Sequence, residues 1–144
     1  MNPAELAWLA GFLDGEGCIG VYKHKTNISR GHQLRVSVTN TDLPSLLKFK
    51  HAFGGGLWEQ GRKGSLGNKP CWEWQATGPV AEAALRRLMP YLVTKAPQAH
   101  VAIRFRQTFG NNRRPRGSRG RHTLPENVLA SRVTCARELS AMKR

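Results

Sequence analysis

The stretch that decides the fold is residues 2–17, NPAELAWLAGFLDGEG. Asn2 can cap a helix, Pro3 suits the first helical position, and Glu5 can complete a capping box from the third position. The stretch therefore predicts a helix that ends at its closing glycines. Its inward face consists of apolar residues at helical spacing: Leu6, Leu9, Ala10 and Leu13.

The period changes after these glycines from that of a helix to that of a strand. Residues 18–25 and 33–40 are predicted strands, joined by a hairpin loop at 26–32. The second strand alternates strictly, with Leu34, Val36 and Val38 on one face and Gln33, Arg35, Ser37 and Thr39 on the other.

The order of helix and two strands then occurs a second time, followed by further helices. Two repeats of this order predict an α+β fold, an αββαββα unit whose four-stranded antiparallel sheet has helices on one face. The remaining elements are expected as a helix at 42–53, strands at 57–60 and 71–77, helices from Pro79 and from Ala96 or Pro97, and a last amphipathic helix at 125–143 that uses Val128, Leu129, Val133, Ala136 and Leu139.

The other face of the sheet is rich in hydrogen-bonding side chains. Such a face is either a surface that reads a ligand or one that is simply exposed to solvent, and the pattern leaves both interpretations open. The residues expected there are Tyr22, His24, Gln33, Arg35, Ser37, Thr39, Glu73 and Gln75.

The chain is strongly basic. It has 144 residues, a length typical of one domain, and 23 Lys and Arg residues against 9 acids, for a formal charge of +14. This excess suits a polyanionic partner, either nucleic acid or an anionic membrane. Membrane is disfavoured, because no apolar run is long enough to span one.

Cysteine usage points to a reducing compartment. The three cysteines are odd in number and form no CxxC pattern, which argues against a disulfide framework and against a zinc site. The N-terminus lacks the pattern of a secretory signal, a basic segment followed by an apolar one. The protein is therefore expected in the cytoplasm and nucleoid or in an organellar matrix, and it is not expected to be secreted.

The segment 110–122, GNNRRPRGSRGRH, contains five arginines and no apolar residue, which predicts a basic tether between a domain at 1–109 and a helix at 123–144. It is either a solvated linker or a set of phosphate contacts, in which case Arg113, Arg114 and Arg116 are expected to bind the backbone of a nucleic acid.

Two acidic residues, Asp14 and Glu16, stand at the end of the first predicted helix. Carboxylates there have the wrong sign for the helix dipole, and a bound cation would offset that cost. Carboxylate and carbonyl oxygens are the ligands that Mg2+ prefers. An acidic turn with capping glycines is the other interpretation.

Residues 9–17, LAGFLDGEG, resemble the nine-residue motif that names the LAGLIDADG homing endonucleases. The small pair after the first leucine, both acidic positions and the final glycine match, although Glu16 stands where the name has Asp. The order of elements to residue 109 also resembles that family, whereas 110–144 shows no resemblance.

The resemblance implies one half of an enzyme, because the motif occurs once and single-motif members act as homodimers. Their motif helices pack together, which assigns Ala7, Gly11 and Gly15 to the dimer interface. The same small residues could instead pack against the core of their own chain.

The resemblance further implies a site-specific endonuclease that hydrolyses double-stranded DNA at a long, roughly palindromic target with Mg2+ (or Mn2+). It assigns Glu16 and the Gly15 carbonyl to the metal, and Glu16, Lys95 and Asn40 to catalysis. Each sheet would read one half of the target in the major groove. The rivals are a non-cleaving maturase or regulator on the same fold, and a basic structural protein of the ribosomal type.

Overall fold

The computed structural model describes residues 1–23, 31–61, 69–109 and 125–143. Its elements follow the predicted order, with a short 3-10 turn, η2, before the fourth helix. They are α1 (Pro3–Glu16), β1 (Gly17–Lys23), β2 (His32–Asn40), α2 (Leu43–Phe53), β3 (Gly56–Gln60), β4 (Cys71–Thr77), α3 (Gly78–Leu88), η2 (Met89–Tyr91), α4 (Ala96–Gln107) and α5 (Glu126–Ala141).

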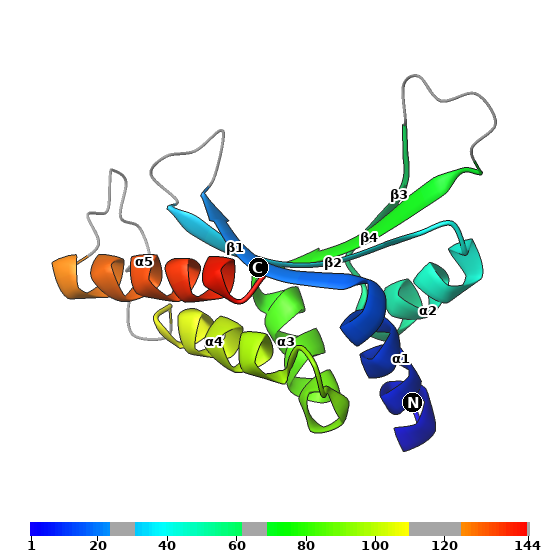
Figure 1. Cartoon of the computed structure of the whole chain (residues 1–144), viewed down its shortest axis with the longest axis horizontal. Coiled ribbons are helices and arrows are strands. Elements are labelled where there is room, and N and C mark those ends of the chain that lie inside the picture. Colours follow the sequence, from blue (N-terminus) through cyan, green and yellow to red (C-terminus); the bar gives the residue numbers. More distant parts are fainter. Residues whose placement is uncertain (24–30, 62–68, 110–124, 144) are drawn as a thin grey trace, which may run out of the picture.

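The four strands form one antiparallel sheet in the order β1-β2-β4-β3. The helices lie on one side of this sheet, and its other side is concave and carries no helix (Figure 1). The predicted α+β architecture is confirmed. Among the described residues, no helix combines the length and the apolar character needed to cross a membrane.

The core lies between the sheet and the helices. Leu34, Val36 and Val38 are fully buried, as the strict alternation of β2 predicts. From the neighbouring strand, Trp74 packs against Phe49 of α2 with ring centroids 4.9 Å apart. Each strand therefore gives one face to the core and leaves the other for the concave surface.

The ends of α1 follow from its sequence. The Asn2 side chain accepts the Glu5 N–H at 2.9 Å, and the Glu5 carboxylate accepts the Asn2 N–H at 3.1 Å, which completes the predicted capping box. At the other end, a Cβ added to Gly17 would lie 2.7 Å from the Leu13 carbonyl oxygen. The last glycine of the motif is therefore required by close approach of the chain to itself.

The triple glycine turns the chain from α2 into β3. Gly54 and Gly55 have backbone φ angles of 78° and 82°, values that residues with a side chain rarely adopt. A Cβ on Gly55 would also lie 2.5 Å from the Gln75 carbonyl oxygen of β4. The Gly54 carbonyl accepts the Trp74 indole N–H at 2.8 Å, which satisfies the polar atom of this buried ring.

The last helix packs against α4 and β1 and contributes Cys135 and Leu139 to the core. The predicted helix is confirmed, but its predicted inward face is partly wrong, because Leu129 is 44% exposed and Arg132 is buried. The Arg132 guanidinium lies 3.7 Å from the Phe109 ring centre and donates to Thr108 Oγ1 at 3.0 Å. An arginine whose charge stacks on an aromatic ring can occupy a core position that counting apolar residues misses.

Candidate nucleic-acid interface and catalytic carboxylate

The strand register gathers the predicted polar side chains on the concave face. Ser37 pairs with Cys18 on one side and Gln75 on the other, and Thr39 pairs with Glu73. The described residues of this predicted set are half-buried or exposed, in contrast to the fully buried side chains between them on β2. They are Tyr22, Gln33, Arg35, Ser37, Thr39, Glu73 and Gln75.

Two residues of β3 join this face and were not predicted. Trp58 pairs with Glu73 and is 40% exposed, and Gln60 donates to the Glu73 carboxylate. The predicted strand was only four residues long, too short to assign its faces by alternation alone. The pairing of β3 with β4 shows that Trp58 and Gln60 lie on the same face as Glu73.

Both edge strands carry an aromatic ring laid over a glycine on this face. A Cβ added to Gly20 would lie 2.7 Å from the Tyr22 ring, and one added to Gly56 would lie 2.7 Å from the Trp58 ring. The rings cover backbone that would otherwise be open, as aromatic residues do for glycines at sheet edges. The concave face is therefore bordered by one aromatic side chain on each edge strand.

Arg35 is held in place on this face by the Tyr22 ring, whose centre is 4.7 Å from the guanidinium carbon. Its Nε is buried and has no hydrogen-bond partner among the described residues. A guanidinium stacked on a ring keeps its fork of donors in a defined plane, the geometry required for bidentate contacts.

The second part of the site lies where α1 ends. The two Asp14 carboxylate oxygens accept the backbone N–H groups of Val93 at 2.7 Å and of Lys95 at 2.8 Å, just before α4. The Lys95 ammonium donates to the Asp14 carbonyl oxygen. Asp14 thus accepts two backbone N–H groups of the segment that leads into α4, and these donors offset the unfavourable dipole of its own helix.

Glu16 and Gly15 differ from Asp14 because both are exposed. The Glu16 side chain forms no hydrogen bond or ion pair with the rest of the described chain, so its carboxylate is free to bind a ligand. The described residues contain no group of three or more His, Cys, Asp or Glu side chains placed to hold a metal. One chain thus offers one free carboxylate at this end of the helix.

Asn40 lies at the same end of the sheet. Gly17 pairs with Val38, so Asn40 lies two residues beyond the start of β1. Its Oδ1 accepts the Asp42 N–H at 2.9 Å, which shapes the turn into α2. Its side-chain amide nitrogen forms no hydrogen bond within the described chain.

The outer face of α1 is small and exposed. Ala7, Gly11 and Gly15 all lie on it, and a Cβ added to either glycine would meet no atom of this chain within 4 Å. The interpretation in which these residues pack against their own core is therefore wrong. Leu9 and Leu13 point inward, as predicted.

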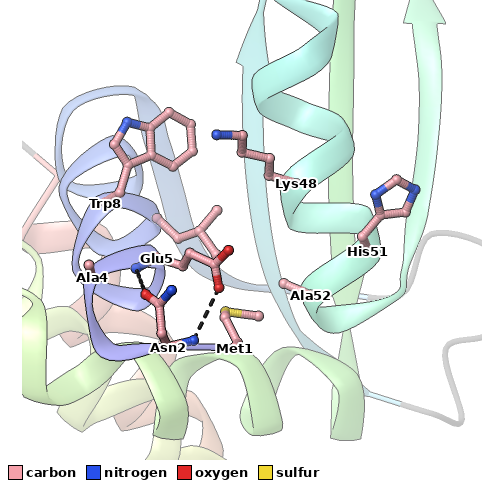
Figure 2. Close-up of a pocket in the computed structure, with 9 residues that line it drawn as sticks. Met1, Asn2, Ala4, Glu5, Trp8, Lys48, His51 and Ala52 are labelled. Carbon is pink, nitrogen blue, oxygen red and sulfur yellow. Dashed lines mark hydrogen bonds between the residues drawn. The ribbon is translucent and has the colours of Figure 1, made fainter.

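The structure also contains a pocket of about 530 Å³ between the start of α1 and α2 (Figure 2). Trp8 forms one wall, with the Lys48 ammonium 4.5 Å from its ring centre, and His51 lies at the far side. None of the predicted catalytic residues lines this pocket. The remaining predicted DNA contacts, His24, Arg113, Arg114 and Arg116, lie outside the described residues.

The fold combines a four-stranded sheet that has one helix-covered face and one open polar face with an exposed carboxylate at the end of a small-faced helix. Residues 9–77, just under half of the chain, match the family described as LAGLIDADG endonuclease. The predicted family resemblance is therefore confirmed over these residues. No curated protein sequence matches the chain.

Solved homing endonucleases share the fold. I-CvuI in complex with its target has a TM-score of 0.71 and 21% identity, with 96% of this chain and 82% of that chain covered. The archaeal intron-encoded homing endonuclease I-Vdi141I complexed with DNA has a TM-score of 0.73 and 17% identity, and the match covers 98% of this chain and 85% of that chain. I-SmaMI bound to cleaved DNA has a TM-score of 0.59 and 20% identity, and the match covers 98% of this chain and 47% of that chain.

The structural likeness reaches further along the chain than the sequence resemblance does. The structural likeness extends past residue 109, whereas the sequence resemblance was expected to end there. The reason is that α5 packs into the same core as the preceding elements, and packing of this kind leaves no motif in the sequence.

Proposed function

We propose that this protein is a site-specific, double-strand DNA endonuclease that acts as a homodimer with Mg2+ (or Mn2+). The observation that carries the proposal is the position of Glu16: a free carboxylate at the end of a helix whose outer face is small and exposed, beside an open polar sheet face. The formal charge of +14 supports a polyanionic substrate.

The dimer follows from the outer face of α1. Because added Cβ atoms at Gly11 and Gly15 meet nothing in this chain, the chain itself does not need glycine there for space. Glycine on a helix surface costs about 1 kcal/mol relative to alanine, so a second helix that approaches closely gives these residues a purpose. The chain also covers only 47% of I-SmaMI, as expected for one half of a two-part enzyme.

Pairing two α1 helices would bring two Glu16 carboxylates to one place, whereas a single chain offers one. Carboxylate and carbonyl oxygens are hard ligands of the kind that Mg2+ or Mn2+ binds, so Glu16 and the Gly15 carbonyl fit the ion. When bound, the metal would supply activation of water and stabilisation of the leaving oxygen at a phosphodiester.

Lys95 and Asn40 complete the proposed catalytic set. The Lys95 ammonium is fixed at the Asp14 carbonyl, one residue before Gly15, where it can stabilise negative charge on a bound phosphate. The free amide of Asn40 can orient a water molecule, because its oxygen is already engaged by Asp42.

The concave face is the proposed DNA-reading surface. Hydrogen-bonding side chains occupy alternate positions of β2 and β4, beside Tyr22 of β1, and such side chains can meet base edges in the major groove. The neighbours I-CvuI and I-Vdi141I were solved in complex with target or DNA, which supports the same class of ligand here.

The test is selection of bound and of cleaved sites from a randomised duplex DNA library, with Mg2+ in one arm and a chelator in the other. Double-strand cuts at one roughly palindromic sequence, only with the metal, are the expected result. Sites that are bound in both arms and never cut would instead identify a regulator, and binding without sequence preference would identify a structural protein.

A further inference from the structure

The end of α5 lies beside β1, the strand at one edge of the sheet (Figure 1). A Cβ added to Gly20 would point to the concave face, and there it would lie 2.6 Å from the Lys143 ammonium. Lys143 therefore crosses the β1 edge and lies on the side that carries no helix.

Tyr22 holds Lys143 in this position. The Lys143 ammonium donates to the Tyr22 hydroxyl at 2.8 Å and lies 4.8 Å from the centre of the Tyr22 ring. The hydroxyl in turn lies 3.6 Å from Cys18 Sγ. Burial acts to lower the pKa of Lys143, but the hydrogen bond with Tyr22 and the neighbouring Cys18 outweigh it and raise the pKa, so the lysine stays charged at neutral pH.

The same ring therefore carries two cations, because Arg35 lies 4.7 Å from its centre. Neither Arg35 nor Lys143 forms a salt bridge with a carboxylate of the described chain. Two close positive charges repel each other unless an anion lies between or above them. An ammonium has three donors, and Tyr22 and the neighbouring Cys18 do not use all of them, so donor capacity remains for acceptor atoms of a ligand.

We propose that Lys143 is a further DNA-contacting residue, fixed by Tyr22, and that α5 is thereby part of the DNA-binding surface of each subunit. The proposal rests on the proposed function. Lys143 and Arg35 together offer donors to acceptor oxygens or nitrogens of DNA, which belong either to a phosphate or to the edge of a base.

The test is equilibrium binding of Lys143→Met to the duplex obtained by selection and to a scrambled duplex, across a salt series and without divalent metal. Arg137→Met is the matched control, because it removes one exposed cation from the same helix outside this cluster. Lys143→Met is expected to bind the selected duplex about tenfold more weakly near 0.1 M salt, as for one lost ionic contact. Arg137→Met is expected to stay within about twofold of wild type.

The two duplexes distinguish the sources of the acceptor. Equal losses on both, with a salt slope smaller by about 0.9, identify a phosphate contact, and a loss confined to the selected duplex identifies a base contact. Either supports the proposal. Lys143→Met binding that matches wild type, or that matches Arg137→Met, overturns it.

Tyr22→Phe tests the anchoring step, because it removes the hydroxyl and keeps the ring. It is expected to weaken binding in the wild-type background and to have no further effect in Lys143→Met, and additive losses would overturn the role of Tyr22 as the anchor. If wild-type protein binds neither duplex, the proposed function fails and this inference fails with it. If wild-type protein binds and Lys143→Met is unchanged, only the inference fails.

Discussion

Asp14 and Lys95 are joined in both directions: the Asp14 carboxylate accepts the Lys95 backbone N–H at 2.8 Å, and the Lys95 ammonium donates to the Asp14 carbonyl. This link fastens the end of α1 to the start of α4. It also divides the two acidic residues of the motif into one that is engaged in the fold and one, Glu16, that is free.

Asp14→Asn should destabilise the fold. The amide can accept one of the two backbone N–H groups but loses the charge, and an impaired acceptor for the part-buried Lys95 N–H costs about 1–3 kcal/mol, whereas water can replace the acceptor at the exposed Val93 N–H. The free energy of unfolding in urea measures the loss. Glu16→Gln is the matched control, since its exposed carboxylate has no partner in the described chain, and equal losses in the two variants would contradict this assignment.

Glu16→Gln should abolish DNA cleavage while site binding stays within about tenfold of wild type, because only one charge changes and the cationic contacts remain. Conversion of supercoiled plasmid carrying the selected site, with Mg2+, measures cleavage. Glu126→Gln, which neutralises an exposed carboxylate on α5, should cut like wild type. Cleavage by Glu16→Gln at a near wild-type rate would remove Glu16 from the proposed site.

Gly11→Leu should separate the subunits and leave each one folded. An added Cβ meets nothing in this chain, and leucine favours a helix over glycine by up to about 1 kcal/mol. Light scattering gives the mass, and circular dichroism checks the fold. Ala130→Leu, on the exposed face of α5, should remain dimeric. A dimer that survives Gly11→Leu would place the interface elsewhere.

Gly17→Ala should destabilise the chain by about 1–3 kcal/mol, because the methyl group would press against Leu13 and its carbonyl at the start of β1. The backbone of Gly17 has φ of −89°, so the cost is steric and not conformational. Thermal unfolding measures it. Gly61→Ala is the control, since an added methyl group there meets nothing, and a Gly17→Ala protein as stable as this control would argue against the close contact.

Stability should fall below about pH 6.5, the ordinary pKa of histidine, because of His32. Burial, then the charges of Lys23 and Arg132, lower the pKa of this residue in the folded state. Between the lowered pKa and 6.5 the unfolded chain binds more protons, so its free energy falls relative to the folded state as pH decreases. Urea unfolding at a series of pH values from 5 to 8 gives the free energy of unfolding at each pH. This free energy should change less with pH in His32→Leu than in wild type, and an equal change in both would exclude His32 as the cause.

Sequence periodicity predicted the sheet well, because the two central strands, β2 and β4, alternate and every helix has a proline at or near its start. The capping box of Asn2 and Glu5 and the buried trio of β2 are fixed by neighbours close in the chain. The buried Arg132 was not predictable in this way, since its partner Phe109 belongs to another helix and its burial depends on stacking.

The candidate site shows the same division. Alternation placed Arg35 and Gln75 on the open face, but no local pattern separates Asp14 from Glu16, because the N–H donors that engage Asp14 come from residues about eighty positions away. Lys143 was missed for a similar reason. Its partner Tyr22 is 121 positions distant, and only the packing of α5 brings them together.

Because side chains of β2 alternate between the open face and the core, residues that form the open surface are separate from residues that stabilise the fold. Substitution of Gln33, Arg35 or Ser37 changes the open face without changing the volume of the core, whereas Leu34, Val36 and Val38 cannot vary without affecting stability. A protein whose DNA target changes in sequence over time could therefore alter its sequence preference through substitutions at single outward positions of the strand. Under the proposed function, changes in DNA preference are thus largely uncoupled from the maintenance of the fold.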